Sequence, residues 1–408
     1  MKVTVVGGGN AAQVVSALLS SVDFEANKRI ELTLLTTFGD EAERLKNGVK
    51  ENGGIMLLNP DGTKTVGMPH LITNDVAEGI RGANLILIIM PSFGHMDVLK
   101  AMAPFVEENT TVGAFPAQSG FQFKACECLD VVGKNLVVFG LDKLPYNCRA
   151  VEYGKCIRVF AYKNVVGVAT IPSSKVKATT DLLNDTIPYL DMYPMNSFLA
   201  VTLASSNQTI HPCRMYGLFH DYSGIPLKEN PLFYESMDEL SADLMGRVSN
   251  EMQEIGKKIT KASASENAPI DLTDLPTLEQ GLKKAYTFDD DSSLQRLLMT
   301  IDGFKGIGTP MKHNPDGTWE PDYTVRYFTE DTPALCATKG LALLAGVETP
   351  TIDMLIRWGQ KKIGKVFLSE DNKLLHGSDL HEAGAPQEYN IKTMHELLEN
   401  EIVGKLPL

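Results

Sequence analysis

The chain begins with a glycine-rich loop that comes directly after a short apolar segment. Residues 2–6 are rich in β-branched side chains, and Gly7, Gly9 and Ala12 then occupy the three key places of a G-x-G-x-x-A pattern. In this pattern the first glycine allows a tight turn, the second lets a pyrophosphate approach the backbone, and the small third residue lets a helix pack closely. The N-terminus of that helix offers free N–H groups to the anion. The strand before the loop and the helical spacing after it favour a dinucleotide site over a turn without a ligand.

The residues around this loop and after the second predicted strand define the cofactor site. We expect contacts from Gly7, Gly8, Gly9, Asn10, Ala11, Ala12 and Thr36. The second strand ends without the usual acidic residue for a ribose 2′-OH and without an arginine for a 2′-phosphate. Asp40 would serve only if its loop curls back, and Arg44 lies further along. The sequence therefore favours NAD weakly and does not exclude NADP.

Strand-like and helix-like segments alternate through the first third of the chain. Strands are predicted at residues 2–6, 30–35, 85–89, 111–115 and 135–139, and helices at 11–21 and 40–50. Regular alternation of this kind predicts a parallel, doubly wound sheet. The turn-forming sequence at 59–62 predicts a hairpin inserted in that sheet.

The second half of the chain has a different pattern of predicted secondary structure. Long helix-like segments occur at 196–207, 237–262, 293–301, 333–346 and 353–365, with irregular, proline-bearing stretches between them. We therefore predict two domains, a Rossmann-type α/β dinucleotide-binding domain at 1–190 and an all-helical substrate domain at 191–408.

Charge and cysteine content exclude several classes of protein. The 408 residues carry a net charge of −13, which opposes binding to nucleic acid and, less strongly, to anionic membranes. The six cysteines include no C-x-x-C pair, so neither a disulfide framework nor a structural metal site is expected. The first strand leaves no room for a signal peptide, and the longest apolar run, 83–91, is far shorter than the ~20 residues of a membrane helix. We expect a cytoplasmic protein.

His211 is a candidate for proton transfer in the second half. An imidazole titrates near neutrality, as the reduction of a carbonyl or imine requires. Because Pro212 disfavours helix at the residue before it, His211 is predicted at a helix boundary or kink that faces a cleft. By itself this pattern also fits a hydrogen-bonded structural histidine.

Arg326 and Asp331 lie in a second notable segment. The spacing makes Asp331 the N-cap of the helix that follows, and an ionised carboxylate there could also orient an imidazole. A guanidinium such as that of Arg326 can clamp a carboxylate through two parallel hydrogen bonds. A surface arginine is equally compatible with the sequence.

Seven sequence motifs together resemble the opine dehydrogenases, the octopine/nopaline dehydrogenase group. They run in order along nearly the whole chain, at residues 5–10, 115–121, 144–149, 210–212, 231–234, 326–331 and 359–364. The resemblance implies an NAD(P)-binding Rossmann domain and a helical substrate domain. It also implies an enzyme that condenses an α-keto acid, usually pyruvate, with the amino group of an amino acid and reduces the imine.

The same resemblance assigns roles to individual residues. The family's catalytic histidine falls on His211, and the carboxylate that partners it falls on Asp331. Its substrate arginine falls on Arg326, its pyruvate-contacting glutamine on Gln118, and a cysteine near the amino-acid substrate on Cys148. We expect small-molecule substrates, no nucleic-acid or membrane partner, and a monomer or homodimer.

The chain departs from the octopine-forming enzymes around its Leu144-Pro145 motif. Asp142 and Lys143 stand where those enzymes carry Glu-Thr, and Tyr146 replaces a tryptophan. We hypothesise that Lys143 suits a small amine bearing a carboxylate or sulfonate, such as alanine, glycine or taurine. A solvated Lys143 without this role is equally compatible with the sequence.

Two other functions are consistent with parts of the pattern. One is a dehydrogenase of a hydroxy acid or sugar acid, which needs no amine. The other is a non-catalytic NAD(H)-binding sensor. Oxidation of NADH by a keto acid alone would favour the first, and tight NADH binding without turnover would favour the second.

Overall fold

The computed structural model describes residues 1–408 except 24–28, 164, 265–269, 274 and 408. The chain packs as two compact units, Met1–Val201 together with His395–Leu408, and Thr202–Met394. The sequence predicted domains at 1–190 and 191–408. In the structure, the segment 191–201 and the residues His395–Leu408 belong to the first unit instead of the second. The domain limits stay a prediction, and each unit is described by itself.

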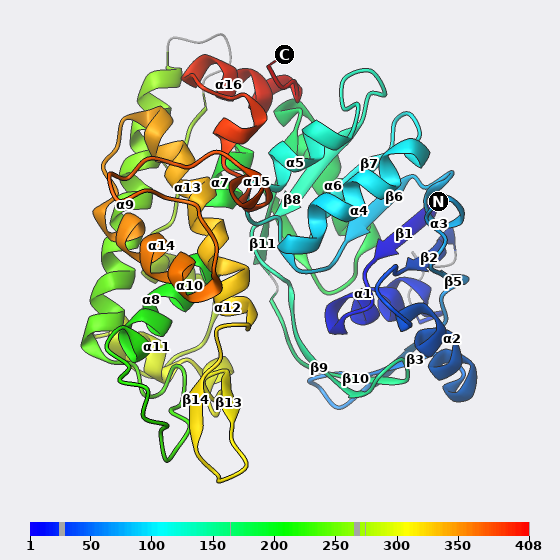
Figure 1. Cartoon of the computed structure of the whole chain (residues 1–408). Helices are drawn as coiled ribbons and strands as arrows, with labels where there is room; N and C mark the ends of the chain where they lie inside the picture. The colour runs from blue at the N-terminus through cyan, green and yellow to red at the C-terminus, as the bar shows by residue number, and fades with distance from the viewer. Residues whose placement is uncertain (24–28, 164, 265–269, 274, 408) are drawn as a thin grey trace. The chain divides into compact units, whose positions relative to one another are not determined.

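The first unit is built on a large sheet whose described strands follow the order β12-β11-β8-β7-β6-β1-β2-β5. Their bounds are β1 Lys2–Val6, β2 Glu31–Leu35, β5 Leu71–Thr73, β6 Leu85–Ile88, β7 Thr111–Ala114, β8 Val137–Leu141, β11 Val165–Ile171 and β12 Asp191–Pro194. Neighbouring strands are parallel except β8 and β11, which pair antiparallel. The five strands predicted from the sequence are all present, with β1 between β2 and β6 (Figure 1).

Helices cover both faces of this sheet. They are α1 Asn10–Ser20, α2 Glu41–Asn52, α3 Val76–Ile80, α4 His95–Met102, α5 Phe121–Cys128, α6 Val176–Thr186, α7 Phe198–Leu203 and α16 Met394–Val403. Leu85 and Leu87 of β6 pack in the core that contains α1, whereas Ile86 and Ile88 pack in the core that contains α4 and α5. Alternate residues of one strand thus enter opposite cores, which explains the continuous apolar run.

The predicted hairpin at 59–62 exists, but its place in the parallel sheet was wrong. Its strands β3 Ile55–Leu58 and β4 Lys64–Gly67 belong to a separate sheet of order β4-β3-β10-β9, with β9 Tyr146–Glu152 and β10 Cys156–Tyr162. β3 pairs parallel with β10, so that Met56 lies opposite Cys156. The hairpin therefore finds its partner about a hundred residues later, and no local pattern in the sequence carries that information.

The second unit is mainly helical. Its described helices are α8 Asn207–Phe219, α9 Glu239–Ser263, α10 Leu278–Ala285, α11 Leu294–Thr300, α12 Arg326–Thr329, α13 Asp331–Ala345, α14 Pro350–Ile363 and α15 Ser378–Ala383, with a short hairpin of β13 Met311–His313 and β14 Trp319–Pro321. Helices α8, α9, α13 and α14 pack against one another. The helix predicted at 196–207 was wrong, because α7 ends at Leu203 and α8 begins at Asn207.

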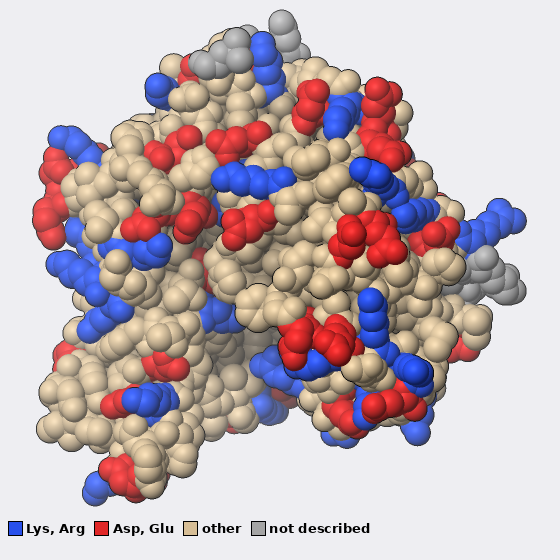
Figure 2. All heavy atoms as spheres, turned by 45° about the vertical axis from the view of Figure 1, so that its right-hand side comes forward, with Lys and Arg blue, Asp and Glu red and all other residues tan. Residues whose placement is uncertain are grey.

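The surface charge is distributed in small groups of both signs. Figure 2 shows one face on which acidic and basic side chains alternate over short distances. None of the helices in the described ranges is long and apolar enough to cross a membrane.

Candidate functional site

The glycine loop has the backbone shape that its sequence predicts. Gly7 has a φ of +128°, its N–H donates to the Leu35 carbonyl at 2.8 Å, and a Cβ atom there would lie 2.3 Å from the Ile89 carbonyl oxygen. Only glycine fits this position. Gly9 is the N-cap of α1; a Cβ atom built on it meets nothing within 4 Å, and no side chain caps the helix. The first turn of α1 thus presents an open, uncapped N-terminus, which suits a pyrophosphate.

A buried glutamine holds the loop from behind. Gln13 donates from Nε2 to the Gly8 carbonyl at 2.9 Å, and its Oε1 accepts from the Gly154 N–H at 3.0 Å. Gly154 lies in the turn between β9 and β10. Of the other predicted loop residues, Ala12 is fully buried and the Asn10 side chain accepts from the Ala150 N–H at 3.3 Å. The second sheet is therefore bonded directly to the glycine loop.

A carboxylate that sequence reasoning missed lies over the same loop. Thr36, at the end of β2, donates from Oγ1 to Oε2 of Glu41 at 2.6 Å, and a Cβ atom on Gly8 would lie 2.2 Å from that oxygen. Asp40, which the sequence offered instead, is exposed and pairs with Arg44 at 2.8 Å. Glu41 comes from the first turn of α2, where acidic residues are favoured by the helix dipole, so its position alone gave no functional signal.

Gln118 lies in the loop that connects β7 to α5. Its side chain is buried, and Oε1 has no hydrogen-bond partner in the described part of the chain. The next two residues, Ser119 and Gly120, have φ angles of +54° and +61°, which turn the chain sharply into α5. A buried amide oxygen without a partner is costly, so Gln118 is placed to accept a hydrogen bond from a bound molecule or water.

Cys148 and Lys143 lie on the segment after β8. Cys148 is buried in β9, and burial raises the pKa of its thiol to about 11, so it stays protonated at neutral pH. Lys143 Nζ lies 3.1 Å from Oδ2 of Asp142, whose Oδ1 accepts from the Gly167 N–H at 3.0 Å. Burial raises the pKa of Asp142, although Lys143 opposes that shift. The positive charge of Lys143 is therefore partly balanced by its neighbour.

His211 is held on several sides in the second unit. Its Nδ1 lies 2.7 Å from Oδ2 of Asp331, and both side chains are buried. Because an ionised carboxylate only accepts, Nδ1 carries the proton and Nε2 is left as the acceptor of the neutral ring. The Tyr327 ring stacks on the imidazole at a centroid distance of 3.7 Å, and the edge of Phe233 contacts it at 5.7 Å.

One local prediction about these residues was wrong. Asp331 is the first residue of α13, not its cap; Glu330 occupies the N-cap and makes no side-chain capping bond. The Asp331 carboxylate bonds the imidazole instead. For His211, predicted at a helix boundary or kink, the structure excludes the boundary, because both His211 and Pro212 lie inside α8.

Arg326 begins α12, five residues before Asp331. About half of its side chain is exposed, and Nε lies 3.6 Å from Oε2 of Glu330. The residues 326–331 thus supply a guanidinium, the ring that stacks on His211 and the carboxylate that bonds it. A half-exposed guanidinium near a buried imidazole is suited to binding an anionic group while the imidazole moves a proton.

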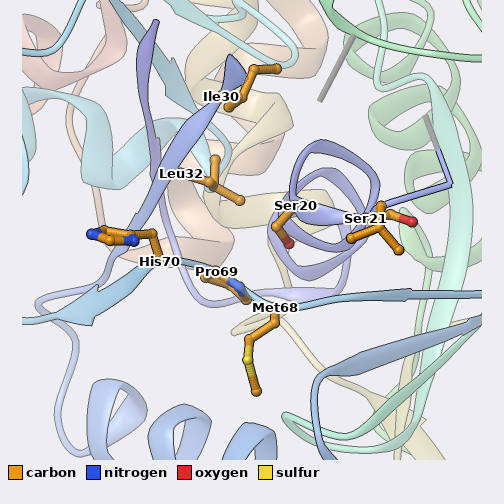
Figure 3. A pocket seen from close by; sticks show the side chains of 8 residues that line it. Ser20, Ser21, Ile30, Leu32, Met68, Pro69 and His70 are labelled. Atoms are coloured by element: carbon orange, nitrogen blue, oxygen red, sulfur yellow. The ribbon is translucent and has the colours of Figure 1, made fainter. Parts of the chain in front are cut away.

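Two pockets in the described residues lie away from these side chains. One of about 470 Å³ is located at the C-terminal end of α1, opposite the glycine loop, where Figure 3 shows the residues that line it: Ser20, Ser21, Val22, Ile30, Leu32, Met68, Pro69 and His70. A second lies beside α9 and α10. Neither contains a predicted site residue. Within the described ranges no group of histidine, cysteine and acidic residues could hold a metal ion.

Comparison with known proteins gives a consistent result over the full length. The family described as NAD/NADP octopine/nopaline dehydrogenase, alpha-helical domain, matches residues 194–363. The chain is 34% identical to the opine dehydrogenase of Haliotis discus hannai, covering 97% of this chain and 98% of that protein. It is 33% identical to the tauropine dehydrogenase of Arabella iricolor, covering 97% and 99%.

The fold of the chain also agrees with that of a solved structure from the same family. A solved structure of octopine dehydrogenase in complex with NADH and agmatine superposes with a TM-score of 0.86 at 30% identity, covering 98% of each chain. This confirms the predicted Rossmann-type α/β domain followed by a helical domain. The chain belongs to the opine dehydrogenase family of oxidoreductases.

Proposed function

We propose that this enzyme joins an α-keto acid, pyruvate in the first instance, to the amino group of a small amino acid and reduces the imine with NADH. The observation that carries the proposal is the buried bond between His211 and Asp331, in a chain whose relatives are opine dehydrogenases. Related solved structures contain NADH with L-arginine and NADH with pyruvate.

The glycine loop fits the cofactor. Gly7 shapes the turn and Gly9 leaves the N-terminus of α1 open, and we propose further contacts from Gly8, Asn10, Ala11, Ala12 and Thr36. Bound NADH supplies the hydride that reduces the imine carbon. The protein binds the pyrophosphate through backbone N–H groups, which need no basic side chain.

His211 is the proposed acid and base. Asp331 accepts from Nδ1–H and fixes the tautomer, so Nε2 can take a proton from the attacking amine and return it to the departing water. Stacking against Tyr327 fixes the plane of the ring. The buried carboxylate also stabilises the imidazolium while it carries the extra proton.

Arg326, Gln118 and Cys148 are the proposed substrate contacts. The guanidinium of Arg326 clamps the keto-acid carboxylate, and the side-chain amide of Gln118 assists by hydrogen bonding. The protonated thiol of Cys148 is a weak donor beside the amino acid. These assignments follow the family motifs and stay proposals.

We propose that the amine is small and bears a carboxylate or sulfonate, as alanine, glycine and taurine do. Asp142 is already bonded to the Gly167 N–H and to Lys143, so it is poorly placed to receive a second cation such as a guanidinium. A tauropine dehydrogenase is among the similar proteins. Initial rates with pyruvate, NADH and each of arginine, alanine, glycine and taurine test this, and a preference for arginine would contradict it.

A paired-substrate assay tests the reaction itself. NADH oxidation is expected only when a keto acid and an amine are both present, and the product should contain a secondary amine by mass spectrometry. Oxidation with the keto acid alone would instead identify a hydroxy-acid dehydrogenase. Tight NADH binding without turnover on any pair would identify a sensor.

A further inference from the structure

Three groups from separate segments converge on Gly8 of the glycine loop. Thr36 follows β2, Glu41 begins α2, and Tyr153 lies in the turn between β9 and β10. A Cβ atom on Gly8 would lie 2.2 Å from Oε2 of Glu41 and 3.0 Å from Oη of Tyr153. These two side chains therefore occupy the space directly beside Gly8.

Glu41 is held in one orientation and still has capacity to bind. Its Oε2 accepts from Thr36 at 2.6 Å. A carboxylate has about four acceptor sites, so most remain for hydroxyl donors. The Tyr153 hydroxyl is buried beside the Glu41 carboxylate and interacts with it. Burial, with the charge of Glu41, raises the pKa of Tyr153 above its usual range, so this hydroxyl is a neutral donor.

Arg44, the basic residue nearest in sequence to Glu41, is engaged by two other side chains. Arg44 binds Asp40 through Nε at 2.8 Å, and its guanidinium lies over the Tyr153 ring at 4.5 Å. A nucleotide 2′-phosphate would bring a second strong negative charge next to Glu41, whereas ribose hydroxyls would donate to it.

We propose that Glu41, oriented by Thr36, receives the adenosine ribose hydroxyls and determines the preference for NADH over NADPH. The inference deepens the proposed function, because it rests on the glycine loop binding a nicotinamide dinucleotide. Glu41 thereby replaces the ribose-binding acidic residue that is absent from the end of β2, although its side chain comes from the first turn of the next helix.

Direct binding tests the proposal without turnover. The dissociation constants of NADH and NADPH are measured by cofactor fluorescence for the wild type, Glu41→Gln and Glu43→Gln. Glu43 is the matched control, because it is an exposed acid in the same first turn of α2. The wild type is expected to prefer NADH, and Glu41→Gln should reduce the preference by about 10- to 100-fold, the effect of losing one charge-assisted hydrogen bond. Glu43→Gln should leave it unchanged.

A second variant covers the case in which Glu41→Gln fails to fold. Thr37 is exposed and directly follows Thr36, so Thr37→Arg should place a cation beside the subsite and shift binding toward NADPH without disturbing the core. An unchanged ratio of the two dissociation constants in folded Glu41→Gln, or in Thr37→Arg where Glu41→Gln does not fold, would overturn the assignment of Glu41, while NADH binding and turnover would leave the proposed function standing. A wild type that binds neither dinucleotide would overturn both.

Discussion

At the scale of single residues, the best-defined feature is the environment of His211. One side of the imidazole faces a carboxylate, one face is covered by Tyr327, and the edge of Phe233 contacts it. His211→Ala should therefore lower kcat by about 10²- to 10⁴-fold, because the proton donor is lost. NADH affinity, measured by fluorescence, should stay at the wild-type value. Near-normal turnover would remove His211 from the catalytic role.

Asp331 should act through the imidazole rather than through helix capping. Asp331→Asn keeps the size of the side chain but removes its charge, so the His211 tautomer is no longer fixed, and kcat should fall by about 10²- to 10⁴-fold. Steady-state kinetics should show the change in kcat with little change in the KM for NADH. If Asp331→Asn lowered the melting temperature but left the kcat of the folded protein unchanged, the role of Asp331 would be purely structural.

Tyr327 offers a graded test of ring orientation. Tyr327→Phe retains the stacked ring and should preserve most of kcat. Tyr327→Ala removes the surface against His211 and should lower kcat by about tenfold or more, because small misplacement of a catalytic group is costly. The comparison of the two variants in one assay separates stacking from any role of the hydroxyl. Equal loss in both would contradict a role for the stacked face.

The sequence predicted some of these residues and missed others for a physical reason. His211, Arg326 and Asp331 stand in motifs, and two of them meet in the fold although 120 residues separate them. Glu41 stands in no motif, because its role depends on how the loop after β2 bends back to the glycine loop. Asp331 was misjudged as a cap because helix spacing cannot show that its carboxylate has a tertiary partner.

At the scale of elements, the two outer glycines of the loop should respond differently to the same change. Gly7→Ala combines a positive φ with a 2.3 Å approach to a carbonyl oxygen, so it should destabilise the fold by about 1–3 kcal/mol or more. Gly9→Ala meets open space at an ordinary φ of −71°, so stability should hold while NADH affinity falls. Melting curves and NADH titrations of both variants check this pair. A stable Gly7→Ala protein would contradict the strain argument.

Elements were predictable where their pattern is local. The parallel strands are apolar runs buried on both faces, and their short length and β-branched residues identify them. The second sheet was missed because β3 pairs with a strand about a hundred residues away. In α8, Pro212 predicted a boundary or a kink at His211, but the helix continues through Pro212, where it packs against α9 and α13.

At the scale of the whole molecule, the C-terminal helix returns to the first unit through one buried acid. Oε2 of Glu401 accepts from Ser197 Oγ at 2.6 Å and from the Phe198 N–H at 2.9 Å. Burial is the largest influence, and it raises the pKa of Glu401 from an ordinary value of 4.5 to about 7. The folded state therefore favours the protonated carboxyl.

The sign of the pH dependence follows from that shift. A carboxyl whose pKa is higher in the folded state gives its full stability below about pH 4.5, and that stability is lost as the pH rises to about 7. Glu401→Gln keeps an acceptor for Ser197 and Phe198 but cannot ionise. Its melting temperature should vary less between pH 5 and pH 8 than that of the wild type, and parallel profiles would contradict the shift.

The bridge made by Gln13 has an evolutionary consequence. Because one buried amide satisfies both the Gly8 carbonyl and the Gly154 N–H, neither partner can change its position without leaving the other unsatisfied. The nucleotide-binding turn and the β9–β10 hairpin should therefore change together in evolution, although more than a hundred residues separate them in the chain. A chimera that exchanges one of them between paralogues must carry the other with it.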